Sequence, residues 1–285
     1  MGFYNRFLFV CTGNTCRSPL AEGYLKSLGI KNLDTQSRGL CAFGESASEY
    51  SKIVAKESGF DIDNHISKQF TEADLNADMI ICLSQSHLLS LENHYGKSDK
   101  FTLLGGGISD PYGMPLEHYR LCGKQIFEEI DKLAFGGAFT EFTVNGISQS
   151  DIKDIAKLEK ECFSEPWSEN AIIESVKGGT KFFVAKCEDM VCGYIGISAI
   201  IDEGYITNVA VTENHRNKGI GNMLLNKVFS FAREQGLKFV SLEVRESNAN
   251  AISLYTKKGF VKEGVRKDFY KNPKENAIIM TRRFN

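Results

Sequence analysis

Five residues separate a cysteine from an arginine in the segment Cys11–Arg17, which reads CTGNTCR. The segment follows the apolar run Phe7–Val10 and leads into an amphipathic stretch. Gly13 permits a tight turn, and Pro19 suits the first turn of a helix. Backbone N–H groups turned inward beside a helix N-terminus bind anions and favour the thiolate, which is the nucleophilic form of cysteine. The loop therefore predicts that Cys11 attacks an anionic substrate.

Further residues of this loop suit a phosphate group. Arg17 presents a planar fork of donors that pairs with two phosphate oxygens at once. Ser18 can donate to the sulfur and stabilise it as a leaving group. We expect the loop to bind the anion through Thr12, Gly13, Asn14, Thr15, Cys16 and Ser18.

The longer stretch FVCTGNTCRSPLAE resembles the signature of the low-molecular-weight protein tyrosine phosphatases, and the resemblance covers about residues 5–133. It implies that Cys11 becomes a phosphocysteine and that Arg17 holds the equatorial oxygens. In that family an Asp-Pro motif late in the domain supplies the acid for the leaving group. Asp110 matches this motif and would later act as the base for the hydrolytic water. The alternative for Asp110 is a turn former, because Asp-Pro commonly starts turns.

The resemblance also assigns supporting residues. Asn14, Ser37 and His65 match the residues that brace the loop in that family. Cys16 would form a reversible disulfide with Cys11 that protects the nucleophile from overoxidation. The alternative for Cys16 is a small buried residue.

The residue at position 15 bears on which phosphorylated side chain the loop accepts, and here it is a threonine. Tyrosine-directed members of the family usually carry a bulkier aliphatic residue there, and CTGNTCRS resembles the bacterial protein-arginine phosphatases. A small hydroxyl leaves room beside the thiolate for a planar guanidinium. The sequence favours phosphoarginine, and phosphotyrosine is the alternative.

A second candidate site lies in the stretch VAVTENHRNKGIGNMLL, where a strand-like run ends at Val211 and a long amphipathic stretch follows. Glycines at such a turn let backbone N–H groups approach a pyrophosphate. The turn lacks the Gly-Lys-Ser/Thr ending of a Walker loop. We expect cofactor binding by Arg216, Asn217, Lys218, Gly219, Ile220 and Gly221.

The turn resembles the coenzyme A loop of the GCN5-related N-acetyltransferases (GNAT), over roughly residues 140–285. Three further stretches resemble the RimI-type ribosomal-protein alanine N-acetyltransferases, namely FSEPWS at 163–168, LEVRESNANAISLYTKKGF at 242–260 and ENAIIM at 275–280. The resemblance implies an α+β GNAT fold with acetyl-CoA as co-substrate and a protein N-terminus as acceptor.

The same resemblance assigns roles in acyl transfer. Glu243 would be the general base for the amine, and Tyr255 the acid that protonates the departing thiolate. Asn248 would contact the cofactor, while Val209 and Val211 would pair with the pantetheine arm. The alternatives are a solvated strand residue for Glu243 and core packing for Tyr255.

Elements that can position the first site alternate along the first half of the chain. Apolar runs predict buried strands, and helical periodicity predicts the segments between them. This alternation is typical of a parallel sheet covered on both faces, with ligands beyond the carboxyl ends of the strands. The expected strands are Phe7–Val10, Met79–Leu83 and Phe101–Leu104, and the expected helices are Pro19–Leu28, Ala47–Ser58, Ser86–His94 and Leu116–Leu133.

A short hinge, Ala134–Ala138, separates two expected domains at residues 1–137 and 138–285. The second half has a mixed α+β order. Its expected strands are Glu141–Val144, Lys181–Cys187, Val191–Ile200, Gly204–Val211, Phe239–Arg245 and Ala277–Arg282, and its expected helices are Ser150–Cys162, Ser168–Lys177, Gly219–Gln235 and Ala249–Lys258.

Bulk properties exclude several classes of protein. With 34 Lys and Arg against 36 Asp and Glu, the net charge is −2, so we expect no nucleic-acid partner. No apolar stretch approaches the ~20 residues that span a bilayer, and no signal peptide is evident. The eight cysteines show no metal-ligand spacing and suit reduced core thiols. We expect a cytoplasmic protein without metal or membrane association, and surface positions for His87, His94, His118 and His215.

The sequence thus predicts a bifunctional enzyme: a phosphoprotein phosphatase fused to an acetyl-CoA-dependent N-terminal acetyltransferase. The alternatives are a phosphotyrosine phosphatase joined to a lysine or small-amine acetyltransferase, or one half that serves as a non-catalytic binding module.

Overall fold

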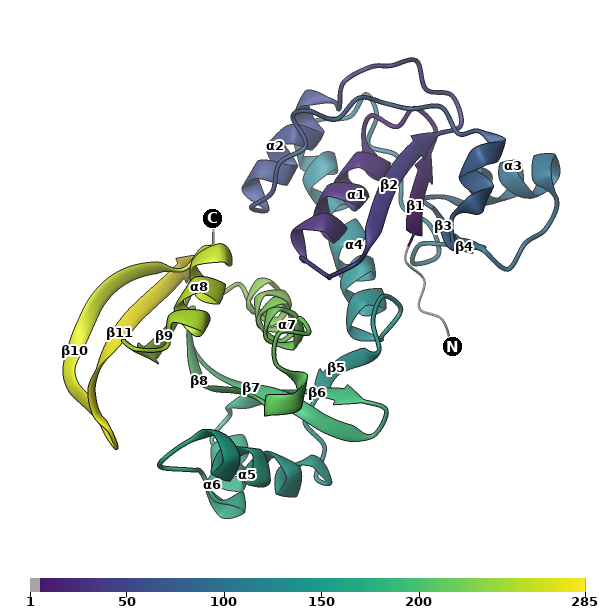
Figure 1. Cartoon of the computed structure of the whole chain (residues 1–285). Coiled ribbons are helices and arrows are strands. Elements are labelled where there is room, and N and C mark those ends of the chain that lie inside the picture. The colour runs from purple at the N-terminus through teal and green to yellow at the C-terminus, as the bar shows by residue number, and fades with distance from the viewer. Residues whose placement is uncertain (1–5, 285) are drawn as a thin grey trace. The chain divides into compact units, whose positions relative to one another are not determined.

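The computed structural model describes residues 6–284. The chain divides into two compact units, one ending at Thr140 and the other starting at Glu141 (Figure 1). This division falls close to the expected boundary at Gly137. Each unit is described separately.

The first unit contains a four-stranded parallel sheet with strand order β2-β1-β3-β4. Its strands are β1 (Arg6–Cys11), β2 (Asp34–Gly39), β3 (Met79–Cys82) and β4 (Phe101–Leu103). Its helices are α1 (Arg17–Ser27), α2 (Glu49–Glu57), α3 (Gln85–Tyr95) and α4 (Leu116–Phe135), with a 3₁₀ turn η1 (Glu72–Asn76).

Strand β1 is buried on both faces, as its apolar run predicts. Successive side chains of a strand point to opposite faces, and β1 contributes to two separate cores. Phe7 and Phe9 pack in the core that includes residues of α1 and α4. Leu8 and Val10 pack in the core that includes Leu91 of α3. The parallel strands place the loops after β1, β3 and β4 at one edge of the sheet, where a ligand can bind.

The second unit contains a seven-stranded sheet with strand order β10-β11-β9-β8-β7-β6-β5. Its strands are β5 (Phe142–Gly146), β6 (Lys181–Cys187), β7 (Met190–Ile200), β8 (Glu203–Val211), β9 (Phe239–Arg245), β10 (Val261–Lys271) and β11 (Lys274–Arg283). Its helices are α5 (Asp151–Cys162), α6 (Glu169–Lys177), α7 (Ile220–Gln235) and α8 (Ala249–Lys257), with a 3₁₀ turn η2 (Glu213–His215).

In this unit α5 and α6 lie on one face of the sheet, and α7 lies on the other (Figure 1). Neighbouring strands pair antiparallel except for β8 and β9, which pair in parallel. That pairing joins Glu203 to Phe239, Gly204 to Val240 and Tyr205 to Ser241, and no pair follows along β8 within residues 6–284. The β9-facing edge of β8 is therefore open from Ile206 onward, which leaves backbone groups available to an extended ligand.

Two strands were not among the expected elements. Strand β2 reads DTQSRG, in which Thr35 and Ser37 are buried, so no apolar run marks it. Strand β10 reads VKEGVRKDFYK and lies at the edge of its sheet, where charged residues are tolerated on an exposed strand. In both cases pairing with a neighbouring strand, rather than local hydrophobicity, determines the conformation.

Candidate active sites

The candidate nucleophile lies at the junction of β1 and the loop before α1. Cys11 is the last residue of β1 and is 3% exposed. The backbone N–H of Asn14 donates to Cys11 Sγ at 3.3 Å, and Ser18 Oγ lies 3.0 Å from the sulfur. Since the Asn14 side-chain amide donates to Ser18 Oγ at 2.8 Å, the Ser18 proton can be directed to the sulfur. These donors are what a thiolate requires.

Asn14 braces this loop from within. It is fully buried and has a positive φ of 54°, a conformation that asparagine tolerates better than most residues. Its Nδ2 also donates to Ser37 Oγ at 2.8 Å, and its Oδ1 accepts from the Lys68 backbone N–H at 2.8 Å. The loop therefore takes its shape from segments that are distant in the sequence.

His65 holds the backbone of the same residue. Its Nε2 lies 2.8 Å from the carbonyl oxygen of Asn14, and its Nδ1 lies 4.0 Å from Glu22 Oε2. Burial lowers the pKa of His65, while the Asn14 carbonyl and the Glu22 carboxylate oppose the shift. A neutral ring whose Nε2–H donates to the carbonyl fits this position.

Arg17 reaches the loop that carries the expected acid. It is 4% exposed, and its Nη1 donates to the Ile108 carbonyl at 3.1 Å. Its Nη2 donates to Asp110 Oδ2 at 2.5 Å, and the Asp110 side chain is 46% exposed. Arg17 Nε is buried and has no hydrogen-bond partner within residues 6–284. Because an unsatisfied buried donor is costly, this nitrogen marks a place where an anion would bind favourably.

Thr15 and Cys16 complete the loop. The Thr15 carbonyl accepts from the Ser48 backbone N–H at 2.8 Å, so the loop backbone is also fixed at this position. Cys16 is 5% exposed, and its sulfur lies 3.5 Å from Ser48 Oγ and 3.6 Å from the Tyr119 hydroxyl. Cys11 and Cys16 are both free thiols.

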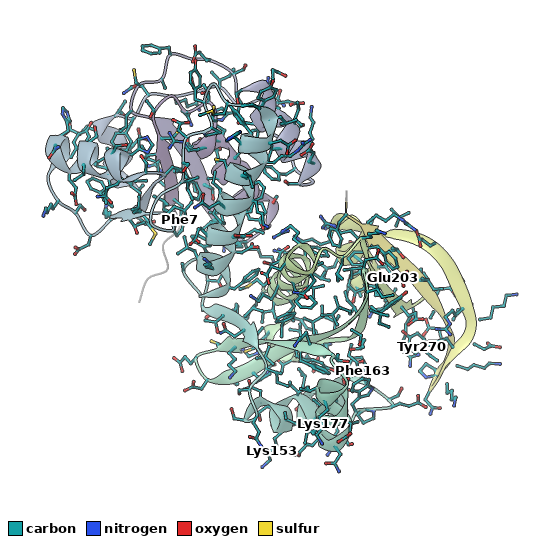
Figure 2. The ribbon with its side chains drawn as sticks, turned by 180° about the vertical axis from the view of Figure 1, so that it is seen from behind. Phe7, Lys153, Phe163, Lys177, Glu203 and Tyr270 are labelled. Carbon is teal, nitrogen blue, oxygen red and sulfur yellow. The ribbon has the colours of Figure 1, made fainter. Side chains whose placement is uncertain are left out.

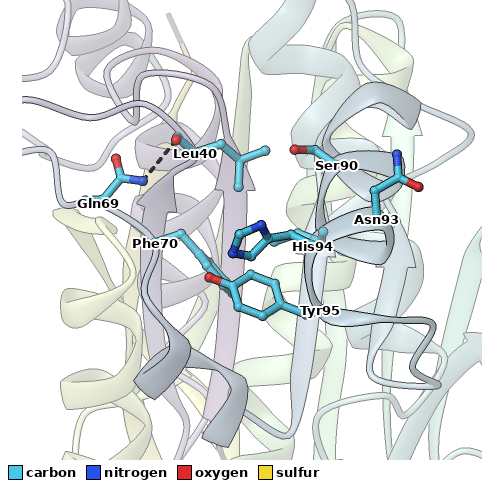
Figure 3. A pocket seen from close by; sticks show the side chains of 8 residues that line it. Leu40, Gln69, Phe70, Ser90, Asn93, His94 and Tyr95 are labelled. Carbon is cyan, nitrogen blue, oxygen red and sulfur yellow. Dashed lines mark hydrogen bonds between the residues drawn. The ribbon is translucent and has the colours of Figure 1, made fainter.

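A separate cavity of about 390 Å³ lies beside this site but does not include the candidate catalytic groups (Figure 3). It is lined by Leu40, Gln69, Phe70, Ser90, Leu91, Asn93, His94 and Tyr95. Gln69 fastens the loop after β2, because its amide donates to the Leu40 carbonyl and accepts from the Ala42 N–H, both at 2.9 Å.

In the second unit the predicted pyrophosphate turn precedes α7. Gly219 is the N-cap residue with a φ of 92°, and Asn217 has a φ of 63°. Arg216 Nε donates to the Val211 carbonyl at 3.2 Å, which closes the turn onto the end of β8. Gly221 has a different role: an added Cβ would lie 3.1 Å from Leu254 Cδ2, so its small size lets α8 approach α7.

The candidate base and acid lie in β9 and α8. The Glu243 side chain is 36% exposed and pairs with Arg266 Nη1 at 2.5 Å. Tyr255 is 7% exposed, and burial, followed by the charge of Tyr270, raises its pKa to about 12. Tyr255 is therefore protonated at neutral pH. The Tyr270 hydroxyl donates to the Glu243 carbonyl at 3.4 Å, so Tyr270 lies close to both candidates.

Asn248 acts as the N-cap of α8. Its Oδ1 accepts from the Ala251 backbone N–H at 3.1 Å. A contact with a cofactor would therefore use the side-chain amide nitrogen.

Comparisons with known proteins match the two units separately. Residues 6–142 match the low molecular weight phosphotyrosine protein phosphatase family, and residues 152–260 match the acetyltransferase (GNAT) family. The first unit of the chain belongs to the phosphatase family, and the second unit contains a GNAT domain. The predicted families and fold classes are thereby confirmed, and both families are families of enzymes.

Individual relatives cover either half. The low molecular weight protein-tyrosine-phosphatase PtpB of Staphylococcus aureus is 42% identical over 135 residues, which are 45% of this chain and 96% of the relative. A putative [ribosomal protein bS18]-alanine N-acetyltransferase of Bacillus subtilis is 29% identical over 143 residues, which are 50% of this chain and 95% of the relative. The solved YwlE arginine phosphatase from Geobacillus stearothermophilus is 34% identical, with a TM-score of 0.44, and the match covers 46% of this chain and 90% of that one.

One prediction about the phosphatase unit was wrong: His87 is not a surface residue. It is 3% exposed, and its Nε2 lies 3.0 Å from Thr12 Oγ1 while its Nδ1 lies 2.8 Å from Ser84 Oγ. Burial, with the positive charge of Arg17, lowers the pKa of His87 to about 4. His87 lies four residues before Leu91, the other buried residue of α3, so the helical period places both on one face. That period was the available signal.

Sequence reasoning also missed Gly39 in the phosphatase unit. A Cβ there would lie 2.6 Å from the Thr12 carbonyl oxygen and 3.0 Å from the Asn14 nitrogen. Only glycine lets the end of β2 pack this closely against the loop, and the loop gains two backbone hydrogen bonds there. Leu40 N–H donates to the Cys11 carbonyl at 2.9 Å, and Cys41 N–H donates to the Thr12 carbonyl at 2.8 Å. The available signal in the sequence was Gly39 itself, which ends the polar stretch DTQSRG.

In the acetyltransferase unit the missed residue is Tyr270, which projects from β10 (Figure 2). Arg245 stacks over its ring at 4.1 Å from the centroid. Because β10 was not an expected strand, no sequence pattern predicted that this tyrosine lies beside Glu243.

Within residues 6–284 no helix is long and apolar enough to cross a bilayer, and no three or more His, Cys, Asp or Glu side chains are grouped to hold a metal ion.

Proposed function

We propose that the chain is a bifunctional enzyme that hydrolyses protein phosphoarginine in its first unit and acetylates protein N-termini in its second. The observation that carries the first activity is Arg17, which follows Cys11 in the same loop, pairs with Asp110 and has a buried Nε that lacks an acceptor within residues 6–284. A bound phosphoryl group would supply that acceptor.

The phosphatase reaction proceeds in two steps. Cys11 Sγ attacks phosphorus, the S–P bond forms, and the bond to the leaving group breaks as Asp110 donates a proton to it. Water then attacks phosphorus and gives a proton to Asp110, while the S–P bond breaks and the thiolate returns. The donors from Asn14 N–H and Ser18 stabilise the sulfur each time it leaves. A phosphate held by Arg17 would replace the Asp110 carboxylate as a partner of the guanidinium and free this acid to reach the leaving group.

Phosphoarginine is favoured over phosphotyrosine by the size of Thr15. The Ser48 N–H fixes the Thr15 carbonyl, so the loop cannot shift easily to make room for a larger side chain. The isoleucine of Thr15→Ile would extend one carbon further into the site, and we expect it to impair phosphoarginine hydrolysis more than phosphotyrosine hydrolysis. An equal loss of both activities would contradict the steric argument and favour a tyrosine phosphatase.

The phosphatase activity itself is tested with p-nitrophenyl phosphate. We expect Cys11→Ser to abolish hydrolysis, since serine is a far weaker nucleophile at neutral pH. Cys187→Ser in the acetyltransferase unit is the matched control and should retain full activity. Equal rates for Cys11→Ser and the parent protein would refute the thiolate mechanism.

The second activity is supported by the open edge of β8 beside the turn before α7 and by a buried, protonated tyrosine. GNAT enzymes use acetyl-CoA as co-substrate; here its pyrophosphate would bind the N–H groups around Gly219, and its pantetheine arm would pair with β8 at Val209 and Val211. The amine attacks the thioester carbonyl, a C–N bond forms and the C–S bond breaks. Glu243 takes the proton from the amine, directly or through water, and Tyr255 donates one to the departing thiolate.

The acceptor proposed is the N-terminal alanine of ribosomal protein bS18, by analogy with the Bacillus subtilis relative. A peptide with that N-terminus is incubated with acetyl-CoA and the full-length protein, and mass spectrometry locates the added acetyl group. We expect modification of the α-amine, and the same peptide with a blocked N-terminus is the control. Modification of lysine alone would favour the alternative of a side-chain acetyltransferase. No detectable binding of acetyl-CoA by calorimetry would favour a non-catalytic module.

A further inference from the structure

The acetyltransferase unit contains a buried carboxylate that the proposed chemistry does not use. Glu159 lies in the last turns of α5 and is completely buried. The surrounding core is apolar and includes Ile155, Phe182 and Tyr194. A charged group is rarely buried so fully without a specific set of partners, so its partners indicate what it does.

Glu159 receives hydrogen bonds from three separate parts of the unit. Its Oε2 accepts from the Trp167 backbone N–H at 2.8 Å, and its Oε1 accepts from Asn208 Nδ2 at 2.7 Å. The Tyr194 hydroxyl also donates to Oε1. All three partners act as donors, which matches an ionised carboxylate. Burial raises the pKa of Glu159, and the Trp167 and Asn208 donors oppose that shift.

Two of the partners of Glu159, Asn208 and Trp167, come from different elements beside the proposed acetyltransferase site. Asn208 is part of β8 and directly precedes Val209, on the stretch whose β9-facing edge is open. Trp167 belongs to the segment 163–168, which connects α5 to α6 and starts at Phe163 (Figure 2). Glu159 therefore ties this connecting segment to the strand that would hold the pantetheine arm.

The other end of the segment reaches β9. Arg245 Nη2 donates to Ser164 Oγ at 3.4 Å. Arg245 and Glu243 are two residues apart on one strand, so their side chains point to the same face of the sheet. The segment 163–168 thus runs from β8 to β9 on the face that presents the candidate base, over the part of the sheet where these strands no longer pair.

We propose that Glu159 is a positioning residue: it fastens the segment 163–168 to β8 and so holds the wall past which the acceptor N-terminus approaches Glu243. This inference rests on the proposed acetyltransferase function. It predicts that loss of the carboxylate weakens use of the acceptor and leaves acetyl-CoA binding intact, because the pyrophosphate turn and the β8 backbone lie outside these contacts.

The experiment uses full-length Glu159→Gln. Glutamine keeps the size of the side chain but turns an NH₂ group toward partners that are all donors. We expect the KM for the bS18 N-terminal peptide to rise about tenfold, the change that loss of one hydrogen bond to a charged group produces. The affinity for acetyl-CoA, measured by calorimetry, should be unchanged.

Trp167 provides a readout that does not depend on activity, because it is the only tryptophan in the chain. In Glu159→Gln its emission should shift to longer wavelength and its quenching by acrylamide should increase. Asp151→Asn is the matched control, since Asp151 is a second buried carboxylate on the same helix, paired instead with Lys186 at 2.6 Å. This control should lower thermal stability without altering Trp167 quenching or the peptide KM.

Two results would overturn the proposal: unchanged Trp167 quenching in Glu159→Gln, or equal weakening of peptide and acetyl-CoA. If Glu159→Gln does not fold, Asn208→Ala removes a single donor and must show the same pattern, to a smaller extent. If the parent protein does not acetylate the peptide, the proposed acceptor is wrong, whereas the Trp167 measurement still decides whether Glu159 holds the segment.

Discussion

Replacement of Asn14 offers the sharpest test of how the phosphatase loop is built. The side chain of Asn14 takes part in three hydrogen bonds of 2.8 Å, to Ser18, Ser37 and Lys68, while its backbone has a φ of 54°. Each hydrogen bond contributes about 1 kcal/mol to the free energy of unfolding. Alanine in the left-handed region adds a cost of about 1 kcal/mol. We therefore expect Asn14→Ala to lower the stability of the phosphatase unit by about 4 kcal/mol.

Asn14→Gly separates the two contributions. Glycine loses the same three hydrogen bonds but adopts a positive φ without steric cost. We expect Asn14→Gly to be about 1 kcal/mol more stable than Asn14→Ala. Both variants should lose about 10²-fold in kcat/KM with p-nitrophenyl phosphate, because the N–H that donates to Cys11 is no longer held in place.

Native-state hydrogen exchange is the appropriate assay, because a two-domain chain does not unfold in a single two-state transition. Peptides from β1 report on the phosphatase unit, and peptides from β9 serve as an internal control that should not change. Equal stability of the alanine and glycine variants would refute the argument from backbone strain. A loss below about 1 kcal/mol in both would refute the argument from hydrogen bonds.

Three further predictions concern Gly219, Tyr255 and His87. Gly219→Ala should weaken acetyl-CoA binding in calorimetry by about tenfold, because alanine at a φ of 92° costs about 1–2 kcal/mol. Gly236→Ala, at the opposite end of α7, should not affect binding. Tyr255→Phe should lower kcat about 10²-fold and leave the KM for acetyl-CoA nearly unchanged, and an unaltered kcat would exclude Tyr255 as the acid. The stability of the phosphatase unit should fall as the pH drops from about 6.5 toward about 4, because the unfolded chain protonates His87 while the native ring, with its lowered pKa, stays neutral. His87→Gln should flatten this pH dependence of hydrogen exchange, and an unchanged slope would contradict it.

The chemical groups of the phosphatase loop could be named from sequence because they are neighbours in the chain, whereas the shape of the loop also depends on distant segments. The nucleophile, the arginine and the helix start lie within the seven residues Cys11–Arg17, and the hydrogen bonds from Asn14 to Ser18 and Cys11 stay within Cys11–Ser18. By contrast, the burial of His87 and the contact of Gly39 with the loop depend on strands that pair across large sequence distances.

The acetyltransferase site shows the same contrast. Its glycine turn and its helix α7 follow from local pattern, and the candidate base and acid were assigned from a resemblance. The position of Tyr270 beside Glu243 could not be predicted, because β10 is a charged edge strand that forms only through pairing with β11.

The sequence by itself determined the two families, the alternation of strands and helices and the chemical groups of both loops, because turns, caps and apolar periods are encoded by neighbouring residues. Only the tertiary structure decided which distant groups meet: Arg17 with Asp110, His87 with Thr12, and Glu159 with Trp167 and Asn208. The contacts of Arg17 and His87 depend on loops that converge at one edge of the parallel sheet. The contacts of Glu159 lie beside the stretch where β8 no longer pairs with β9. Strand pairing of this kind is a cooperative property of the whole sheet, and no short stretch of sequence specifies it.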